Sequence, residues 1–299
     1  AARDFLVAKK SPETLRVFVN TFLAETWEDE GQTVGDIDFQ SREDDWGETV
    51  PDEIVVVTAG IDVQDDRLEL EIVGWGRDEE SWSLGYKTLY GDPSTPHLWN
   101  DLDNILKVAY TTESGRQLGI RAACIDSGGH YTQAVYNFVR PREGRRIFAI
   151  KGMGGEQRPL VSRPTKNNIG KIKLFAVGTF PIKELIFSRL RVQSEGAGYC
   201  HFPAGRSDEY YQQLANSEKI VTKYQKGFPR RDFVKTRTRN EALDCRVYAY
   251  AALCILSLNI NAVADRVVNA PEPEAQPQPQ QSNPLARRPK QGGFVNSWR

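Results

Sequence analysis

The chain has 299 residues, a net charge of −1, 26% charged and 10% aromatic residues, which is typical of a globular protein with one large domain or two small ones. It has no apolar run of the roughly 18 residues that a spanning helix needs, so we expect no membrane segment. The first residues lack the apolar region of a secretory signal. The four cysteines show no CxxC spacing, which favours reduced thiols in a cytosolic protein over a zinc site at Cys200 and His201.

The small net charge hides an uneven distribution. Residues 1–80 contain 22 acidic and 7 basic residues, whereas residues 140–191 contain 13 basic and 3 acidic ones, and residues 219–239 contain 8 basic residues against Asp232 alone. A single run of this kind is usually a solvated face, but two runs favour a surface that follows a nucleic-acid backbone. The candidate DNA contacts in the first run are Arg145, Arg146, Lys151, Arg158, Lys166 and Lys171.

The first half of the chain predicts a helix and then an antiparallel meander. Residues 12–24 have helical periodicity, and an acidic, irregular connector follows them up to Pro51. Three strands, 54–63, 67–76 and 81–91, are joined by tight connections.

The second half alternates helices and strands around a predicted sheet. We expect helix 96–109, strand 120–126, helix 131–140, strand 145–152, strand 171–179, helix 181–191 and a buried helix at 239–260. A meander followed by alternating helices and parallel strands predicts an α/β, ribonuclease H-like fold, with a mixed central sheet flanked by helices. The domain would cover residues 53–262, with a connector at 1–52 and a Pro/Gln-rich tail at 263–299.

Three aspartates stand at the ends of buried elements. Asp62 ends the apolar strand 54–63, Asp126 ends the strand after the first helix, and Asp244 lies in the first turns of the buried helix. A buried carboxylate needs a basic side chain, backbone donors or a metal ion as a partner. Each aspartate alone fits a strand-end cap or an ion pair, but this fold would bring all three to one edge. Clustered carboxylates repel unless divalent cations hold them, so we predict a two-metal Mg²⁺ or Mn²⁺ site.

Other residues could assist this site. Lys151 follows a strand that should end at the same edge, so it is either a contact to the scissile phosphate or a surface lysine. Glu241 is either a further ligand or a partner of the helix dipole. His130 is more often a packing residue than a base. The chain contains no GxSxG and no GxxxxGK[ST], so we expect neither serine catalysis nor an ATPase of its own.

The sequence resembles the C-terminal nuclease portion of the lambda-like large terminase subunits of tailed phages. The matching segments cover most of residues 15–256 in the same order. They are "FVNTFLAETWE", "SREDDWGETVP", "TAGIDVQDDRLELEIVGWG", "ESWSLGYKTLYGDP", "CIDSGGH", "FAIKG", "CHFP" and "RNEALDCRVYAYAAL".

The resemblance implies a metal-dependent endonuclease that cuts concatemeric phage DNA at the start and end of packaging. The acidic residues of the family match Asp62, Asp126 and Asp244. In the two-metal site predicted above, Asp62 would bridge both ions. Full-length members carry a packaging ATPase before this segment, so residues 1–52 would be the connector from it. The implied partners are double-stranded phage DNA, the small terminase subunit and the portal protein, which the tail "GGFVNSWR" would contact, in the host cytoplasm.

Two other functions stay open at this stage. One is a different ribonuclease H-like DNA enzyme, such as a junction resolvase. The other is a non-catalytic module that binds the portal and DNA while the ATPase portion does the work.

Overall fold

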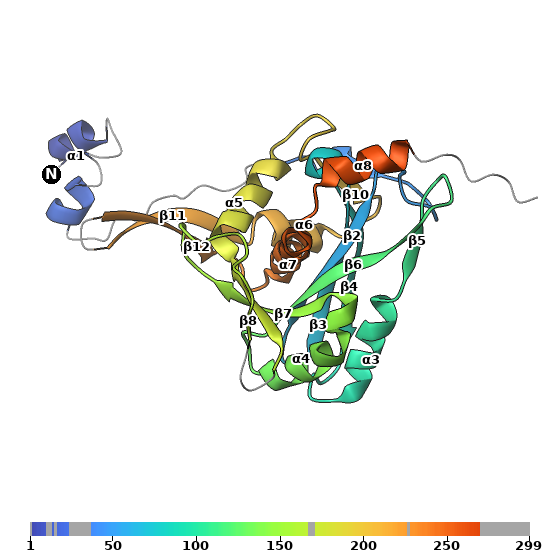
Figure 1. The fold of residues 1–299 in the computed structure, drawn as a ribbon. Coiled ribbons are helices and arrows are strands. Elements are labelled where there is room, and N and C mark those ends of the chain that lie inside the picture. Colours follow the sequence, from blue (N-terminus) through green and yellow to red (C-terminus); the bar gives the residue numbers. More distant parts are fainter. Residues whose placement is uncertain are drawn as a thin grey trace, which may run out of the picture.

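The computed structural model describes residues 2–9, 14, 17–23, 37–166, 171–225 and 228–269. Its centre is a ten-stranded mixed sheet in the order β1-β10-β4-β3-β2-β6-β7-β9-β8, with β5 paired to β6 (Figure 1). The strands of this sheet are β1 (Glu43–Asp44), β2 (Val56–Val63), β3 (Arg67–Trp75), β4 (Ser81–Tyr90), β5 (Ala109–Thr111), β6 (Gln117–Asp126), β7 (Ile147–Met153), β8 (Thr165–Lys166), β9 (Lys173–Gly178) and β10 (Cys200–Pro203).

The centre of the sheet follows the predicted pattern. Strands β2, β3 and β4 form an antiparallel meander, and its first turn is closed by a hydrogen bond from Gln64 N to Arg67 O at 3.0 Å. Strand β6 pairs with β2 in parallel, and β7 and β9 continue the parallel half. This mixed sheet with helices on both faces confirms the predicted fold class.

Helices cover both faces of the sheet (Figure 1). They are α3 (Pro96–Ile105) and α4 (Thr132–Val139) on one face, and α5 (Thr179–Leu190), α6 (Asp208–Ala215) and α7 (Glu241–Leu256) on the other, followed by α8 (Ile260–Val268). Because α7 is apolar nearly all round, it is the buried helix of its face. No single described helix is long and apolar enough to cross a membrane; α7 and α8 meet that test only together, and they are bent by 78°.

Several short elements were not predicted. Strand β10 pairs in parallel with β4, and β1 pairs in parallel with β10, so the sheet begins before residue 53. Strands of two to four residues are too short to show a periodic pattern, which is why the sequence did not indicate them. The expected helix 12–24 falls partly outside the described residues. In its described part, Phe18–Phe22 form a π-helical turn. The tail 270–299 also lies outside them, and the domain limits stay predictions.

A two-stranded antiparallel ribbon extends from the body of the protein beside α5 (Figure 1). It consists of β11 (Glu218–Gln225) and β12 (Phe228–Lys235). One face packs on α5, where the ring of Phe233 lies 5.0 Å from that of Phe180 and 5.3 Å from that of Phe187. At its base, Lys235 Nζ donates to Asn240 Oδ1 at 2.6 Å, which ties the ribbon to the start of α7.

The backbone of α7 lies directly against β2 at Gly60. A Cβ atom at this position would overlap the carbonyl oxygen of Cys245 and the amide nitrogen of Ala249. Only glycine, which has no side chain, allows a helix and a strand to approach this closely. This contact therefore fixes how far along the sheet α7 begins.

The change Gly60→Ala should disrupt this contact. The added methyl group meets helix backbone, which cannot yield unless α7 moves, so we expect a loss of about 3 kcal/mol in the free energy of unfolding, or no folding at all. Urea unfolding measures it. Gly85→Ala in β4 is the matched control, because a Cβ atom there meets nothing within 4 Å. Equal losses in the two variants would contradict the argument.

Candidate active site

Asp62 and Asp126 lie side by side at the ends of two parallel strands. Ile61 of β2 pairs with Ile125 of β6, so the aspartate that follows each of them stands at the same level. Side chains alternate along a strand, and Gly60, two residues before Asp62, faces α7. Both carboxylates therefore belong to the face that α7 covers.

Asp244 reaches the same place from α7. It lies in the first turn of the helix and directly precedes Cys245, whose backbone contacts Gly60. The electrostatic coupling shows the proximity: the negative charges of Asp244 and Asp126 both raise the pKa of Asp62. The structure thus brings the three predicted aspartates together, while their catalytic role stays a prediction.

Burial is the main perturbation at Asp62. Its residue is 5% exposed, and loss of solvent raises the pKa of its carboxyl group. Asp244 raises the pKa further, whereas a hydrogen bond from Gln64 lowers it, and the result is a pKa of about 7. Burial likewise raises the pKa of Asp126, although the amide of Gly128 donates to its Oδ1 at 3.1 Å and the charge of Lys151 favours the ionised form.

Asp62 differs from every other buried acid in the described part of the chain. Six carboxylate residues are buried there, and five of them form an ion pair with lysine or arginine. Those five are Glu69, Glu71, Asp103, Glu218 and Glu241. Asp62 alone has no cationic partner and accepts only the hydrogen bond from Gln64 at 2.5 Å. A buried carboxylate that lacks a counter-charge fits a divalent cation, whose preferred ligands are oxygens.

Glu241 belongs to an arginine network beside the three aspartates. Arg67 Nη2 contacts Glu241 Oε1 at 2.8 Å, and Arg67 Nε contacts Glu69 Oε1 at 2.6 Å. Arg239 joins the same two acids, at 2.5 Å from Glu69 Oε1 and 3.3 Å from Glu241 Oε2. Glu69 pairs with Asp62 across the two strands. Glu241 is therefore neutralised by side chains rather than by the helix dipole alone.

A buried lysine holds Asp244, and sequence reasoning missed it. Lys183 Nζ on α5 lies 2.8 Å from Asp244 Oδ1 and 2.8 Å from Glu218 Oε1. Burial opposes its charge, but the two carboxylates raise the pKa of Lys183 and keep it protonated. Asn240 Nδ2 donates to the other Asp244 oxygen at 2.7 Å. The available signal was that Lys183 lies on the apolar stripe of α5, between Phe180 and Phe187.

The carboxylates are close, but they are not arranged as a finished metal site. Among the residues that the structure describes, no group of three or more His, Cys, Asp or Glu side chains could hold a metal ion as they stand. With Lys183 and Asn240 bonded to Asp244, each of its oxygens already has one partner. The donor chemistry fits Mg²⁺ or Mn²⁺, and binding would have to draw the carboxylates together.

The predicted DNA contacts lie at two opposite edges of the sheet. Lys151 lies in the last half of β7, next to Ile150, which pairs with Asp126, and the exposed Arg158 is in the segment that follows β7. The other four lie at the starts of β7 and β9, at the opposite end of the parallel strands from the aspartates. Arg145 and Arg146 stand before β7, and Lys166 and Lys171 stand beside the start of β9. Parallel strands all start at one edge, so one basic run in the sequence becomes two separate groups.

Neither His130 nor His201 contacts any of the three aspartates within the described residues. His130 is exposed and its Nδ1 lies 3.0 Å from Asp65 Oδ1. His201 stacks on Trp82 at 4.8 Å, while Cys200, its neighbour in β10, faces the α7 side. Because adjacent strand residues point to opposite faces, Cys200 and His201 cannot share a zinc ion. All four cysteines are free.

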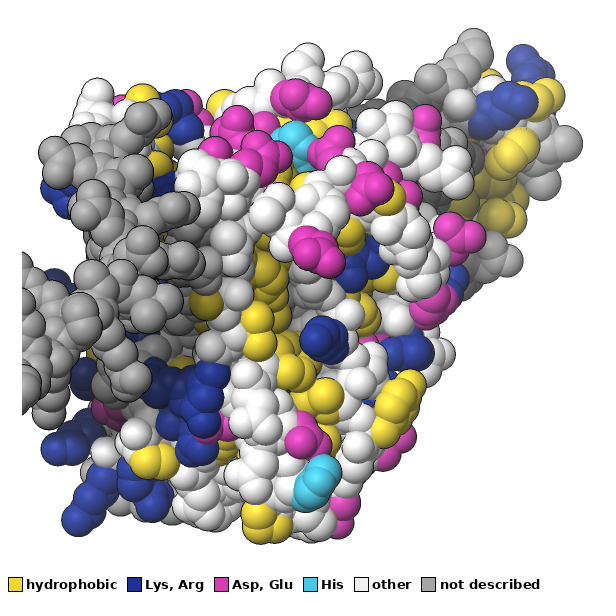
Figure 2. All heavy atoms as spheres, turned by 90° about the vertical axis from the view of Figure 1, so that its right-hand side faces the viewer, with side chains coloured by type: hydrophobic (Ala, Val, Ile, Leu, Met, Phe, Trp, Pro, Cys, Tyr) yellow, Lys and Arg dark blue, Asp and Glu magenta, His cyan; other side chains and the backbone are white. Residues whose placement is uncertain are grey.

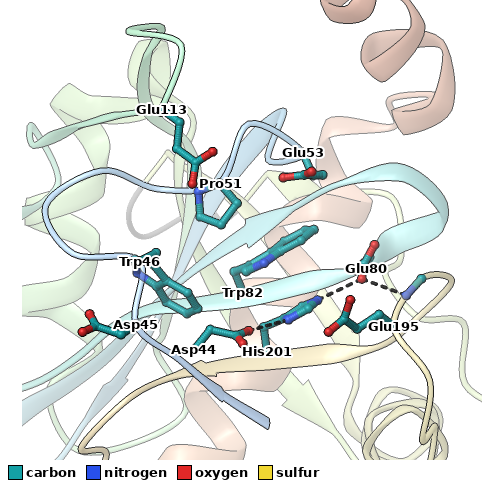
Figure 3. A pocket seen from close by; sticks show the side chains of 11 residues that line it. Asp44, Asp45, Trp46, Pro51, Glu53, Glu80, Trp82, Glu113, Glu195 and His201 are labelled. Atoms are coloured by element: carbon teal, nitrogen blue, oxygen red, sulfur yellow. Dashed lines mark hydrogen bonds and ion pairs between the residues drawn. The ribbon is translucent and has the colours of Figure 1, made fainter.

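His201 lies in an acidic cavity at another edge of the sheet. Its two ring nitrogens contact Asp44 at 2.8 Å and Glu80 at 2.9 Å (Figure 3). Figure 2, which shows the right-hand side of the molecule as seen in Figure 1, has acidic side chains gathered around a histidine in its upper part. The cavity has a volume of about 570 Å³ and contains none of the predicted site residues.

Comparisons with known proteins identify the family. The model of the family described as "Terminase large subunit gpA, endonuclease domain" matches residues 1–265. The chain belongs to this family. This confirms the resemblance seen in the sequence. The three aspartates therefore lie within a terminase endonuclease domain.

Two relatives extend the comparison of this terminase domain. The chain is 33% identical to the terminase large subunit of Escherichia phage lambda over 260 residues, which is 85% of this chain and 41% of that protein. It is 34% identical to the terminase large subunit of Enterobacteria phage P21 over 262 residues, 84% of this chain and 40% of that protein. The chain therefore spans about two fifths of each relative. No solved structure matches it.

The stability of the metal-free domain should depend on Asp62. Its pKa is about 7 in the folded state and ordinarily 3.8, so folding takes up a proton between these values and stability falls as pH rises through this window. The full penalty above it is on the order of 4 kcal/mol. With EDTA present, Asp62→Asn should therefore unfold at a higher temperature than wild type at about pH 8 and at nearly the same temperature at about pH 4.

The control for this measurement is Asp65→Asn. Its side chain is 75% exposed, so its removal should produce no such gain. If Asp62→Asn and wild type melted together at the higher pH, Asp62 would not be the desolvated, uncompensated acid described above.

Proposed function

We propose that this terminase domain is a Mg²⁺- or Mn²⁺-dependent endonuclease that cuts concatemeric phage DNA to make the ends of packaged genomes. The observation that supports it most is Asp62, which is buried without a cationic partner and lies beside Asp126 and Asp244. Family membership supports the nuclease activity. The metal dependence and the role in packaging go beyond what family membership supports and are part of our proposal.

Asp62, Asp126 and Asp244 would hold the ions. Two divalent cations bound by carboxylates would activate water and stabilise the leaving oxygen of a phosphodiester. Lys183 would position Asp244, because its ammonium group already fixes one carboxylate oxygen. Arg67 and Arg239 would keep Glu69 and Glu241 neutralised, so that the uncompensated negative charge is confined to the three aspartates.

The DNA would lie over the edge that carries the aspartates. Lys151 and Arg158 are exposed there, and Lys151 is close enough to favour ionised Asp126. The ribbon begins at the same place, because Glu218 at its base contacts Lys183. Its outer face, away from α5, carries Lys219, Lys223 and Arg230. Basic side chains in this arrangement would grip phosphates beside the cut.

The nuclease is tested by plasmid nicking with the full chain. Wild type should nick in Mn²⁺ and not in EDTA, and Asp62→Asn, Asp126→Asn and Asp244→Asn should each lower the rate about a hundredfold or more, because each removes a ligand charge from a shared site. Asp65→Asn is again the control and should nick as wild type does. Nicking that persists in chelator would exclude the metal mechanism.

The same variants separate the alternatives. If they lose nicking but keep their affinity for DNA, the aspartates are catalytic. If wild type binds DNA and never nicks it in any divalent cation, a non-catalytic module is the better description. A preference for four-way junctions over linear duplex would favour a resolvase.

The role of the ribbon is tested through salt dependence. The variant Lys219→Gln/Arg230→Gln removes two charges that make no ion pair within the described residues, so the slope of log affinity against log salt should fall by about 2. Fluorescence anisotropy with duplex DNA in EDTA measures it. Lys87→Gln/Arg266→Gln removes two exposed charges elsewhere and should leave the slope within about 0.5 of wild type. Equal slopes in both variants would remove the ribbon from the interface.

The remaining partners are proposed from the family resemblance. In full-length members of the family an ATPase portion comes before this segment, and we propose the same arrangement for this terminase. The small terminase subunit would supply the choice of cutting site. The residues proposed to contact the portal protein, 285–299, lie outside the described part of the chain.

A further inference from the structure

A second hollow opens at the opposite edge of the sheet from the aspartates. Its volume is about 320 Å³, and it lies between β6 and the start of β7. On this side of β6, β5 pairs with residues 117–119 and β7 pairs from Ala123 onward, so residues 120–122 face no strand. The hollow is this gap in the sheet. Its charged lining consists of Arg121, Arg145 and Arg146, and no acid lines it.

Arg121 is placed there by a β-bulge. On the other side of β6, Val57 pairs with Ile120 and Thr58 pairs with Ala122, which leaves Arg121 without a partner residue. An extra residue of this kind redirects its side chain, and bulges are frequent beside functional sites. Arg121 is exposed and makes no hydrogen bond or ion pair within the described residues.

Arg146 is placed there by a left-handed backbone conformation. Its φ is 58°, a region that costs a non-glycine residue about 1 kcal/mol. Two hydrogen bonds maintain it: Arg146 N donates to Glu143 O at 2.9 Å, and Ala123 N donates to Arg146 O at 3.0 Å. The strain turns a long basic side chain toward the gap, although an asparagine or glycine would adopt this conformation more easily.

Arg145 completes the group and is already fixed. Its Nη1 contacts Asp103 Oδ1 at 2.5 Å. Asp103 is shared with Arg142 at 2.8 Å and with Lys107 at 2.7 Å, so one carboxylate faces three cations. These contacts lower the pKa of Asp103 and keep it ionised, but they leave a surplus of positive charge around the hollow.

We propose that this hollow is a phosphate-binding site, separate from the nuclease centre. Two independent backbone irregularities, one within β6 and one directly before β7, direct arginines into one gap that no acid lines. Several guanidinium groups around one pocket suit a phosphate, which accepts bidentate hydrogen bonds and carries more charge than a carboxylate. The site is about 16 Å along β6 from Asp126, too far to contact the phosphate that is cut.

The ligand is a phosphate group of the DNA backbone or of a free phosphate compound. Lys166 and Lys171 lie at the same edge of the sheet, which extends the basic surface beyond a single pocket. An extended basic surface suits a polyanion. The experiment therefore uses inorganic pyrophosphate as one probe and duplex DNA as the other.

The test uses the variant Arg121→Gln/Arg146→Gly in the full chain, with EDTA present. Glycine at residue 146 keeps the left-handed backbone without its strain, so this variant should melt at or above the wild-type temperature. Calorimetric titration with pyrophosphate should show a loss of affinity of about tenfold or more. Lys87→Gln/Arg266→Gln, which removes the same charge elsewhere, should change the affinity less than about twofold.

The DNA arm identifies the source of the phosphate. If the salt slope for duplex DNA also falls by about 2 units, the site holds the DNA backbone; if only pyrophosphate binding is lost, the ligand is a free phosphate compound. Pyrophosphate affinity that is unchanged relative to the control would overturn the proposal. A third probe, an oligo-glutamate peptide, tests the alternative of an acidic protein segment. If the variant lost binding of this peptide and kept its affinity for pyrophosphate, the proposal would also be overturned. Because no cleavage is measured, failure of the proposed nuclease would not affect this result.

Discussion

The contact between α7 and β2 at Gly60 fixes the position of the candidate active site. Because no side chain separates helix from strand there, the first turn of α7 begins at the end of β2, and Asp244 lies beside Asp62 and Asp126. Any larger residue at position 60 would push α7 away and separate the aspartates. The geometry of the site therefore depends on Gly60, a residue that has no side chain and takes no direct part in the site.

The face below α7 changes from apolar to charged toward that site. Further along the same strands, Glu71 is paired with Arg246 of α7 at 2.6 Å and Glu69 with Arg67. A buried acid with a partner adds little repulsion, whereas an unpaired one destabilises the fold. Asp62 is the exception, and the loss of stability that it causes is what a bound cation would relieve. The uncompensated negative charge on this face is therefore concentrated at the carboxylate of Asp62.

The sequence predicted the centre of the fold because its elements are long and periodic. Strands β2, β3 and β6 are apolar runs that end in recognisable turns, and Asp62 and Asp126 stand out because each interrupts such a run. The partners of these acids were not predictable. Lys183 approaches Asp244 from a helix about 60 residues earlier, and only the packing of α5 on α7 brings them together. Strands β1 and β10 were missed because two to four residues carry no pattern.

The basic run 140–191 shows why charge in a sequence does not locate charge in space. A parallel strand carries the residues before it to one edge of the sheet and those after it to the other, about 20 Å away for a strand as long as β7. Arg146 and Lys151 are five residues apart and stand at opposite edges. The same rule places Arg121 near the start of β6 and Asp126 at its end. The parallel half of the sheet thus separates an acidic edge, suited to cations, from a basic edge, suited to phosphate, and one long polyanion could contact both only by crossing the strands between them.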